Sequence, residues 1–247
     1  MYHFFVDGNA FLDENIKITG EDVNHIKNAL RMNIGEQVII SRTDVTEDKD
    51  YYCSVTDISD DEVTVHIDWV EEGRELNNKI YLFQGLPKGD KMELIIQKAV
   101  ELGVYEIIPV AMNRCVVKLD NKKEAGKLKR WQMIAESAAK QSKRSIIPQI
   151  KPVMTVNDAI KYAGNIDVLL MPYENAKGIA ETRRVISEIS GNKSVAVFVG
   201  PEGGFDPKEV LSAQAGGFYP VTLGKRILRT ETAGLMMLSV LMYTLED

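Results

Sequence analysis

Two glycine-containing segments in the C-terminal part of the chain combine residue types that could bind a ligand and act on it. VAVFVGPEGGF spans residues 195–205 and LGKRILRTETA spans residues 223–233, and each lies between an apolar run and a helical pattern. Glycines allow the first segment to turn sharply and bring its backbone close to a ligand, whereas Pro201 fixes one dihedral angle and donates no hydrogen bond. The first segment therefore suits a flat heterocycle that is bound through main-chain amides and carbonyls.

The second segment mixes charged and apolar side chains in a way that an ordinary turn does not need. Its leucine, isoleucine and alanine side chains could line an aromatic ring while Arg226 and Arg229 face an anionic substrate. Neither segment matches a phosphate-binding motif, because GxGxxG is absent and GKR lacks the upstream glycine and the hydroxyl residue of a P-loop. GPEGG alone is equally compatible with a tight strand-to-helix turn, so the prediction depends on the two segments together.

The surrounding pattern predicts that both segments lie at strand ends of an α/β domain. Short strand patterns alternate with helical patterns from residue 80 onward. The predicted strands are IYLFQ, EIIPV, IDVLLM, VAVFVG and YPVTL, and the predicted helices are DKMELIIQKAVELG, 127–142, TVNDAIKYA, GIAETRRVISEI, PKEVLSAQA and TAGLMMLSVLMYTL. This alternation predicts a mostly parallel sheet covered on both faces, in which ligands bind beyond the carboxyl ends of the strands.

The first quarter of the chain has the pattern of a separate β domain. EVTVHIDWV alternates apolar and polar residues with a period of two, and QVIIS and YYCSV are rich in strand-forming residues. EDVNHIKNALRM predicts one short helix, closed by the turn at Gly35. The polar stretch EEGRELNNK is the candidate boundary. The sequence therefore predicts a small barrel-like domain over residues 1–72 and the α/β domain over residues 73–247.

Composition argues against several classes of protein. The 247 residues are 45% hydrophobic, which is typical of a soluble globular chain. Cys53 and Cys115 form no CxxC pair and the three histidines have no metal-ligand spacing, so neither a disulfide framework nor a metal site is predicted. The sequence starts without a basic stretch followed by a long apolar run, so no signal peptide is predicted and a cytoplasmic location is the expectation.

Charge is distributed unevenly along the chain, although the formal net charge is −6. Residues 1–72 contain five basic side chains against seventeen acidic ones, whereas residues 118–151 contain ten basic side chains against three acidic ones. We call residues 118–151 the basic tract. It could offer a local positive field to a polyanion such as RNA, or it could be the solvated face of a helix.

The last helical pattern is apolar on nearly every side. A surface helix has one polar face, but AGLMMLSVLMYTL, residues 233–245, has none, and it is shorter than the roughly 20 residues that span a bilayer. We expect one side of this helix in the core of the monomer and the other against a second copy of the chain. Either Met237 or Met242 is then expected to face outward.

The pair VGPEGGF and LGKRILRTETA closely resembles the 16S rRNA (uracil(1498)-N3)-methyltransferase family, together with KGDKMELIIQKAVELGVYEIIPV and the RW…AAKQSKR…IP stretch. The resemblance covers the whole chain and is most specific from residue 88 to residue 233. In the front domain only HFFV and HIKNALRMNIGE carry it.

The resemblance implies a SPOUT-type fold, in which a parallel α/β sheet ends in a C-terminal trefoil knot, with a small N-terminal PUA-like β-barrel that binds RNA. It implies S-adenosyl-L-methionine as cofactor, 16S rRNA or the small ribosomal subunit as partner, and a homodimer with the site at its interface. No membrane and no metal are implied. By the same resemblance the cofactor-binding residues are Leu170, Met171, Pro172, Gly200, Pro201, Glu202, Gly203, Gly204, Leu223, Gly224, Ile227, Leu228, Arg229, Thr230, Thr232 and Ala233.

The chemistry of methylating N3 of uracil indicates which side chains are needed. N3 must lose its proton, and the resulting negative charge spreads onto O2 and O4, so the site needs a proton acceptor and cationic or amide donors. Arg229 is the candidate for charge stabilisation, and Glu231 is the candidate for the proton acceptor or the group that orients it. Glu231 is almost as well explained as a carboxylate at a helix N-terminus. The predicted RNA-binding residues are Lys27, Arg31, Lys88, Arg114, Lys118, Arg144 and Arg226.

Three other interpretations remain open. A ribose 2′-O-methyltransferase of the same class is expected to carry an asparagine-containing front motif, which this sequence lacks. A small-molecule methyltransferase would need neither the basic tract nor the front domain. A non-enzymatic ribosome-binding factor would tolerate loss of the two glycine-containing segments, yet both are intact.

Overall fold

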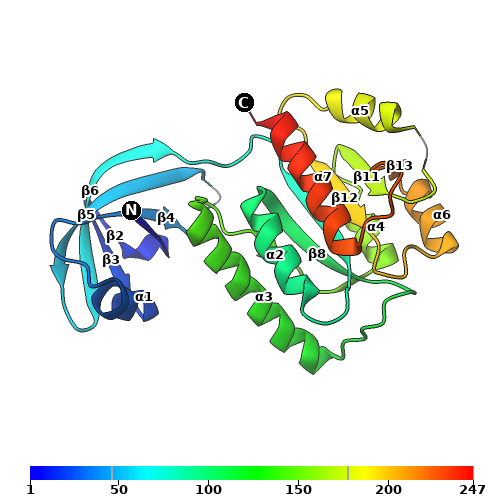
Figure 1. Ribbon diagram of the computed structural model, residues 1–247. Helices are drawn as coiled ribbons and strands as arrows, with labels where there is room; N and C mark the ends of the chain where they lie inside the picture. The colour runs from blue at the N-terminus through cyan, green and yellow to red at the C-terminus, as the bar shows by residue number, and fades with distance from the viewer. Residues whose placement is uncertain (46, 177, 247) are drawn as a thin grey trace. The chain divides into compact units, whose positions relative to one another are not determined.

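The computed structural model describes residues 1–45, 47–176 and 178–246, without the side chain of Asn121 (Figure 1). The chain forms two compact units. The first comprises Met1–Glu75 with Ala139–Ile147, and the second comprises Leu76–Ala138 with Pro148–Asp247. The assignment of Ala139–Ile147 to the first unit adds a segment that the boundary expected from the sequence does not include.

The first unit contains a six-stranded sheet with the order β1-β4-β5-β6-β3-β2. Its strands are β1 (Tyr2–Val6), β2 (Phe11–Leu12), β3 (Asn15–Thr19), β4 (Gln37–Arg42), β5 (Lys49–Ile58) and β6 (Glu62–Glu72), with a short 3₁₀ turn at Gly8–Ala10. All pairs are antiparallel except β1 with β4. The predicted helix is present as α1 (Glu21–Asn24), which continues into a π-helical turn over His25–Leu30 and ends at Arg31 in the left-handed conformation.

The second unit confirms the predicted alternation of strands and helices. Its strands are β7 (Ile80–Gly85), β8 (Val104–Ala111), β9 (Gln149–Ile150), β10 (Met154–Thr155), β11 (Val168–Pro172), β12 (Val195–Val199) and β13 (Tyr219–Val221). They form one parallel sheet in the order β10-β8-β7-β12-β11-β13, with β9 beside β8. The helices are α2 (Lys91–Glu101), α3 (Asn121–Ser142), α4 (Val156–Ala163), α5 (Ile179–Ser187), α6 (Pro207–Ala215) and α7 (Thr230–Leu245).

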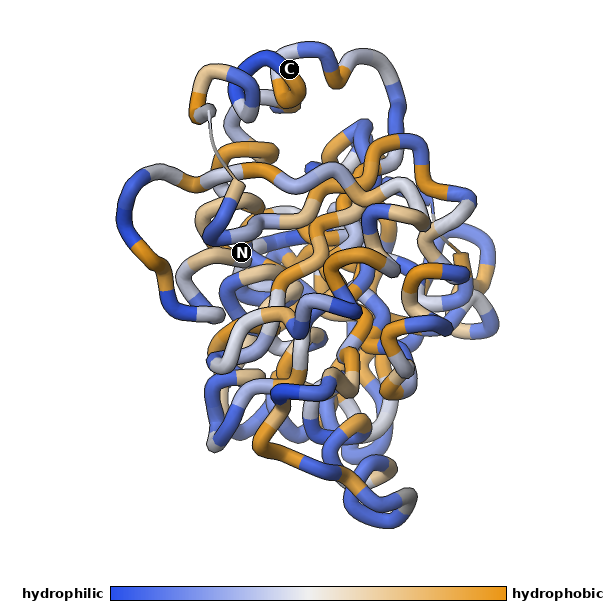
Figure 2. The backbone as a smooth tube through the Cα atoms, turned by 90° about the vertical axis from the view of Figure 1, so that its right-hand side faces the viewer, coloured by the Kyte–Doolittle hydropathy of each residue, from blue (hydrophilic) through white to orange (hydrophobic). Residues whose placement is uncertain are grey.

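Helices cover both faces of the parallel sheet, which explains why its central strands are apolar throughout. All five residues of β12 are buried, and no alternation is needed where both faces are covered. α2 and α7 lie side by side on one face, while α4 packs against α6 on the other (Figure 1). Figure 2 shows the same contrast along the backbone, with hydrophobic segments in the interior and hydrophilic ones in most loops.

Helix α7 confirms the expectation of an apolar helix but corrects which methionine faces outward. Met237 is fully buried with Leu238 and Leu241, and Met242 is only partly exposed. The exposed apolar side chains on this helix are Met236, at 37%, and Tyr243, at 84%. Along the described part of the chain, no helix combines the length and the apolar character needed to cross a membrane.

Candidate functional site

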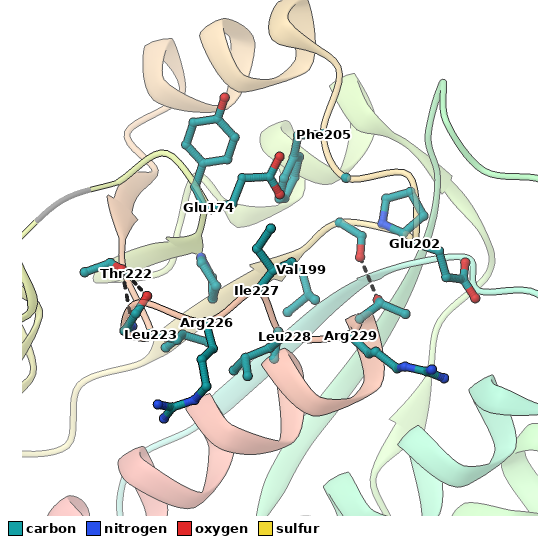
Figure 3. Close-up of a pocket in the computed structure, with 18 of the residues that line it drawn as sticks. Glu174, Val199, Glu202, Phe205, Thr222, Leu223, Arg226, Ile227, Leu228 and Arg229 are labelled. Carbon is teal, nitrogen blue, oxygen red and sulfur yellow. Dashed lines mark hydrogen bonds between the residues drawn. The ribbon is translucent and has the colours of Figure 1, made fainter.

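A cavity of about 510 Å³ opens in the second unit where the loops after β11, β12 and β13 meet (Figure 3). Its volume lies in the usual range of small-molecule sites. The residues lining it are Lys88, Lys91, Pro172, Tyr173, Glu174, Val199, Gly200, Pro201, Glu202, Gly204, Phe205, Thr222, Leu223, Gly224, Lys225, Arg226, Ile227, Leu228, Arg229, Thr230 and Ala233. The structure therefore brings the two glycine-containing segments together in one site.

Most of the predicted cofactor-binding residues line this cavity. They are Pro172, Gly200, Pro201, Glu202, Gly204, Leu223, Gly224, Ile227, Leu228, Arg229, Thr230 and Ala233. Leu170 and Met171 do not, because both are fully buried inside β11. Gly203 and Thr232 are also outside the lining, and the Thr232 side chain is exposed on the first turn of α7.

Several residues that line the cavity were not among the predicted binding residues. Tyr173 and Glu174 follow Pro172 directly, and Phe205 follows Gly204 as the last residue of the first segment. Extending each run of predicted binding residues by one or two positions would have found them. Thr222 precedes the second segment in the same way. Lys91, by contrast, lies at the start of α2, far away in the sequence, and no local pattern distinguishes it.

Buried hydrogen bonds join β7 to both glycine-containing segments. Gln84, at the end of β7, donates from Nε2 to Thr230 Oγ1 at 2.8 Å and to the Gly85 carbonyl at 3.0 Å. Thr230 in turn donates to the Gly200 carbonyl at 2.6 Å. All of these groups are buried, so breaking the chain of bonds would leave polar atoms unsatisfied. The start of α7 is thus fixed against the GPEGG turn.

A second pair of hydrogen bonds holds the start of the LGKRILRTETA segment. Thr182 of α5 donates to the Thr222 carbonyl at 3.0 Å and accepts from the Thr222 amide at 3.1 Å. Gly224, two residues on, has φ +115°, a conformation that residues with a side chain rarely adopt. These features fix the chain where Thr222 and Gly224 line the cavity.

Gly203 and Gly204 serve different contacts in the GPEGG turn. A Cβ at Gly203 would lie 3.0 Å from Arg114 Cβ, and Arg114 Nη1 donates to the Gly203 carbonyl at 3.1 Å. The absence of a side chain at Gly203 therefore makes room for Arg114. Gly204 has φ +67° and faces the cavity, where the atoms nearest to a Cβ at this position would be the carboxylate oxygens of Glu174, at 3.5 and 3.6 Å.

Lys91 connects the carboxylates of the two segments. Its Nζ lies 3.1 Å from Glu202 Oε1 and 3.2 Å from Glu231 Oε2. The pKa of Lys91 is raised, chiefly by its hydrogen bond to Glu202. Burial acts to raise the pKa of the Glu202 carboxyl, but hydrogen bonds from its own amide, Lys91 and the Lys88 amide hold it below the ordinary value. Glu231 itself does not line the cavity and reaches it through Lys91.

The predicted RNA-binding residues fall into two groups. Lys88 and Arg226 line the cavity, and the Lys118 side chain is exposed. Arg31 is exposed at the end of the π-helical turn. Lys27, however, forms an ion pair with Asp60 at 2.7 Å, and Arg114 is committed to the Gly203 carbonyl.

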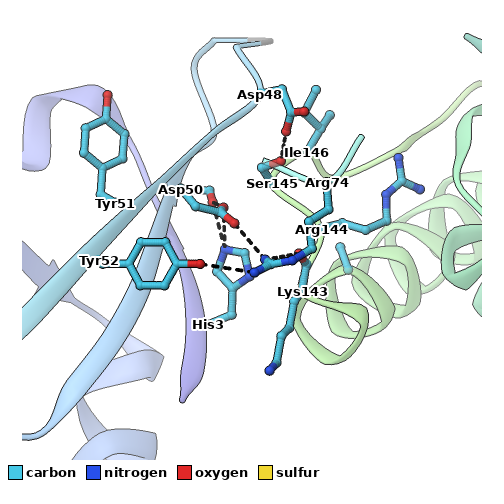
Figure 4. A network of polar contacts seen from close by, with 12 residues as sticks. His3, Asp48, Asp50, Tyr51, Tyr52, Arg74, Lys143, Arg144, Ser145 and Ile146 are labelled. Carbon is cyan, nitrogen blue, oxygen red and sulfur yellow. Dashed lines mark hydrogen bonds and ion pairs between the residues drawn. The ribbon is translucent and has the colours of Figure 1, made fainter. Parts of the chain in front are cut away.

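Arg144 is the predicted RNA contact that fits its role least well. It is buried within the first unit, where its Nε lies 3.0 Å from Glu75 Oε1 and its Nη2 also contacts the same carboxylate. Figure 4 shows Arg144 beside a wider polar network of this unit. A phosphate contact at Arg144 would require the Glu75 pair to break.

The network in Figure 4 surrounds a buried histidine. His3 Nε2 lies 2.8 Å from Ser41 Oγ, and Ser41 donates to Asp50 Oδ1 at 2.7 Å, so the histidine must carry its proton on Nε2. Arg74 pairs with Asp50 at 3.0 Å and donates to the Tyr52 hydroxyl at 3.1 Å (Figure 4). Burial, followed by the nearby charges of Arg74, Lys140 and Lys143, lowers the pKa of His3 to about 4.

No group of three or more His, Cys, Asp or Glu side chains able to hold a metal ion occurs among the residues that the structure describes. Two glutamates, Glu174 and Glu202, line the cavity. Among the residues that the structure describes, Glu202 has a cation within ion-pair distance and Glu174 has none. The site thus offers glycine-rich backbone, apolar walls and charged side chains.

Comparisons with known proteins match both units. The family described as the RNA methyltransferase domain matches residues 74–242, and the RNA methyltransferase PUA domain matches residues 18–68. A ribosomal RNA small subunit methyltransferase E from Bacillus subtilis is 41% identical over 235 residues, which cover 93% of this chain and 90% of that protein. The protein of the same name from Mesomycoplasma hyopneumoniae is 35% identical over 239 residues, which cover 97% and 98%.

A solved structure extends the match to the fold. The ribosomal RNA small subunit methyltransferase E from Neisseria gonorrhoeae, bound to S-adenosyl methionine, is 31% identical and superimposes with a TM-score of 0.82. The match covers 98% of this chain and 97% of that one. The likeness therefore includes both units and the segments that build the cavity.

Proposed function

Because the chain belongs to the ribosomal RNA small subunit methyltransferase E family, we propose that it methylates N3 of uridine 1498 in 16S rRNA. It is an rRNA methyltransferase that uses S-adenosylmethionine, the cofactor that is bound in the structure of the relative from Neisseria gonorrhoeae. The observation that carries the proposal is the cavity in which GPEGG and LGKRILRTETA meet. The trefoil knot, expected from the resemblance, remains part of this proposal.

The cavity fits S-adenosylmethionine in size and in chemistry. Its volume of about 510 Å³ suits a ligand of this size, and Val199, Leu223 and Leu228 offer an apolar wall to the adenine ring. The backbone of the GPEGG turn offers amides and carbonyls close by. When bound, the cofactor supplies an activated methyl group on its sulfonium sulfur, so the protein has chiefly to position the substrate, exclude water and manage charge.

Arg229 fits the role of charge stabiliser. It lines the cavity, its side chain is exposed, and within the described chain no carboxylate lies within ion-pair distance of it. It precedes the first turn of α7, where free backbone amides add partial positive charge. A guanidinium there can stabilise the charge that develops on O2 or O4 of the uracil.

The proton from N3 is assigned to the carboxylates that share Lys91. Glu202, Glu231 and Lys91 carry a net charge of −1 between them when all are ionised, so the group becomes neutral on taking one proton. Glu231 lies outside the lining, so it acts by orienting Lys91 and Glu202. This favours the orienting role over direct proton acceptance by Glu231.

RNA binding is assigned to the cations at the cavity. Lys88, Lys225, Arg226 and Arg229 line it, and in the described chain none of their side chains has a carboxylate within ion-pair distance. These cations can bind phosphates, while the target uridine is flipped out of its stack into the site. The first unit, which matches a PUA domain, adds a contact at the exposed Arg31, whereas Lys27 must first release Asp60 before it can bind RNA.

A homodimer completes the proposal. Met236 and Tyr243 are exposed apolar side chains on α7, and Ile227 is 84% exposed at the cavity. A second copy would cover this apolar surface and close the site. Sedimentation of the wild-type protein tests this point, and a monomer that still methylates RNA would contradict it.

The function is tested by incubating the protein with radiolabelled S-adenosylmethionine and small-subunit rRNA that lacks the modification, either naked or assembled. We expect label on N3 of uridine 1498. Label on a ribose would identify a 2′-O-methyltransferase, and absence of label from both substrates would contradict the proposed activity.

A further inference from the structure

Glu174 is a carboxylate in the cavity that has no role in the proposed chemistry and takes no part in the hydrogen bonds that hold the two segments in place. It follows β11 and lines the cavity, and Figure 3 shows its side chain pointing inward, beside Phe205 and Ile227. Its carboxylate is the nearest group that a Cβ at Gly204 would meet, at 3.5 and 3.6 Å. Among the described residues it has neither an ion-pair nor a hydrogen-bond partner.

The other carboxylates at the site are committed. Glu202 accepts hydrogen bonds from Lys91 and from the Lys88 amide at 3.2 Å, and Glu231 is held by Lys91 at 3.2 Å. Both therefore share one cation of the protein, Lys91. Glu174 is instead exposed at the cavity beside Phe205, Ile227 and Gly204, and no described group donates a hydrogen bond to its oxygens.

The arrangement divides the cavity by charge. Glu174 lies within it, whereas Figure 3 shows the guanidinium groups of Arg226 and Arg229 directed away from Glu174. A phosphate is repelled by a carboxylate and attracted by the arginines. The Glu174 side therefore disfavours a phosphate and suits a ligand with N–H or O–H donors.

We propose that Glu174 is a cofactor-binding residue that accepts hydrogen bonds from the donor-rich part of S-adenosylmethionine. This inference rests on the proposed function. Two parts of the cofactor share the required chemistry, namely the vicinal hydroxyls of the ribose and the α-ammonium group. Either gives a charge-assisted hydrogen bond, which is stronger than a neutral one. The residue sets how tightly and in what pose the cofactor is held.

The test is calorimetric binding in the absence of RNA, comparing the wild-type protein with Glu174→Gln. Glutamine keeps the size of the side chain but loses the charge and one acceptor oxygen. We expect S-adenosylmethionine to bind at least about tenfold more weakly to the variant. Glu188→Gln is the matched control, because Glu188 is exposed at the C-terminal cap of α5, pairs with Arg184 and does not line the cavity. The control should bind like the wild type.

Two further ligands identify the part of the cofactor that Glu174 holds. S-adenosylhomocysteine keeps both ribose and ammonium, whereas 5′-methylthioadenosine keeps the ribose and lacks the amino acid. Weaker binding of both ligands to Glu174→Gln assigns the ribose hydroxyls, and weaker binding of S-adenosylhomocysteine alone assigns the ammonium group.

The possible failures are distinguishable. Equal affinity of the wild type and a folded Glu174→Gln variant for S-adenosylmethionine overturns this inference and leaves the proposed function standing. A wild-type protein that binds none of the three ligands overturns both. Thermal unfolding without ligand checks the fold of each variant, and Glu174→Asp, which keeps the charge, should recover part of the affinity.

Discussion

The basic tract at residues 118–151 and the segment at residues 223–229 are both rich in cations, yet their cations are used in opposite ways. In the basic tract most of the cations form ion pairs: Lys123 with Asp120, Lys127 and Arg130 with Glu93, Lys140 with Asp22, Arg144 with Glu75, and Lys151 with Glu106. In the segment, Lys225, Arg226 and Arg229 line a cavity without such partners in the described chain. A count of charges along the sequence therefore overstates what the basic tract can offer to RNA.

The difference is physical. A cation that already holds a carboxylate must give up that contact before it binds a phosphate, so its net gain is small. A cation without a carboxylate partner releases counterions on binding and contributes its full share. The short segment is thus the stronger candidate for RNA contact, although the tract carries more charge.

The largest effect should come from Arg229→Ala, which removes a cation from the cavity. We expect the rate of methyl transfer to fall by about 100-fold or more, as is typical when one donor to a developing negative charge is lost. Single-turnover methylation of small-subunit rRNA measures it. Arg130→Ala removes a paired cation of the tract and should change the rate less than about twofold, on the scale of a surface pair. Similar losses in the two variants would erase the contrast between the regions.

Replacing Arg144 should lower the stability of the protein more than its affinity for RNA. Removing the Arg144 side chain leaves the largely buried Glu75 carboxylate without its cation, which costs about 3 kcal/mol in the free energy of unfolding. Urea unfolding of Arg144→Ala measures this loss, and the double variant Arg144→Met with Glu75→Met should recover most of it. The salt dependence of RNA binding should not change in the folded protein. A slope reduced by about one unit would instead show that Arg144 contacts a phosphate.

A smaller effect is expected on RNA affinity from Lys225→Ala combined with Arg226→Ala. Each lost phosphate contact should reduce the slope of log affinity against log salt by about one unit, so the double variant should lose about two. Affinity for S-adenosylmethionine should be retained. The matched control is Lys123→Ala with Lys127→Ala, which removes the same charge from paired positions of the tract. Equal slopes in the two double variants would contradict the proposed difference.

The smallest effect is expected from His3 and the polar network around it, which lies within the first unit. His3 has its pKa lowered to about 4 by burial and nearby cations, so the unfolded chain binds a proton more readily than the folded one between about pH 6.5 and pH 4. The stability from neutral His3 is complete above pH 6.5 and is lost as the pH falls. We expect a loss of about 1 kcal/mol between about pH 7.5 and pH 5.5. His3→Gln keeps a donor for Ser41 and should remove this part of the pH dependence, as followed by urea unfolding. The same pH dependence in both proteins would exclude His3 as its source.

The sequence predicted the elements better than their contacts. Short apolar runs that alternate with helical patterns identified the parallel sheet. A strand buried on both faces is apolar at every position, and this pattern can be recognised in each strand separately. The sequence also identified the two segments of the cavity. It did not identify Gln84 or Lys91, whose roles depend on groups more than a hundred residues away. The pairing of the basic tract was hidden for the same reason, since Glu75 and Glu93 precede it by tens of residues.

The orientation of the last helix illustrates the same limit. Its composition indicated an apolar helix covered on more than one side, but not which methionine faces outward. That depends on how α7 rotates against β7 and β12, where Gly234 lies near Gln84 and Val199. Met237 is buried as a result, and Met236 is exposed.

The hydrogen bonds from Gln84 to Thr230 and from Thr230 to the Gly200 carbonyl have a consequence for biosynthesis. They join residues separated by 146 and 30 positions, so the Gly200 carbonyl of the GPEGG turn lacks its Thr230 partner until Thr230 has left the ribosome and α7 has docked. A nascent chain can form its earlier strands first, since domains acquire structure as they emerge. Its methyl-donor site is completed only with α7, so a ribosome-bound chain that lacks this helix has most of the fold and no capacity to act on rRNA.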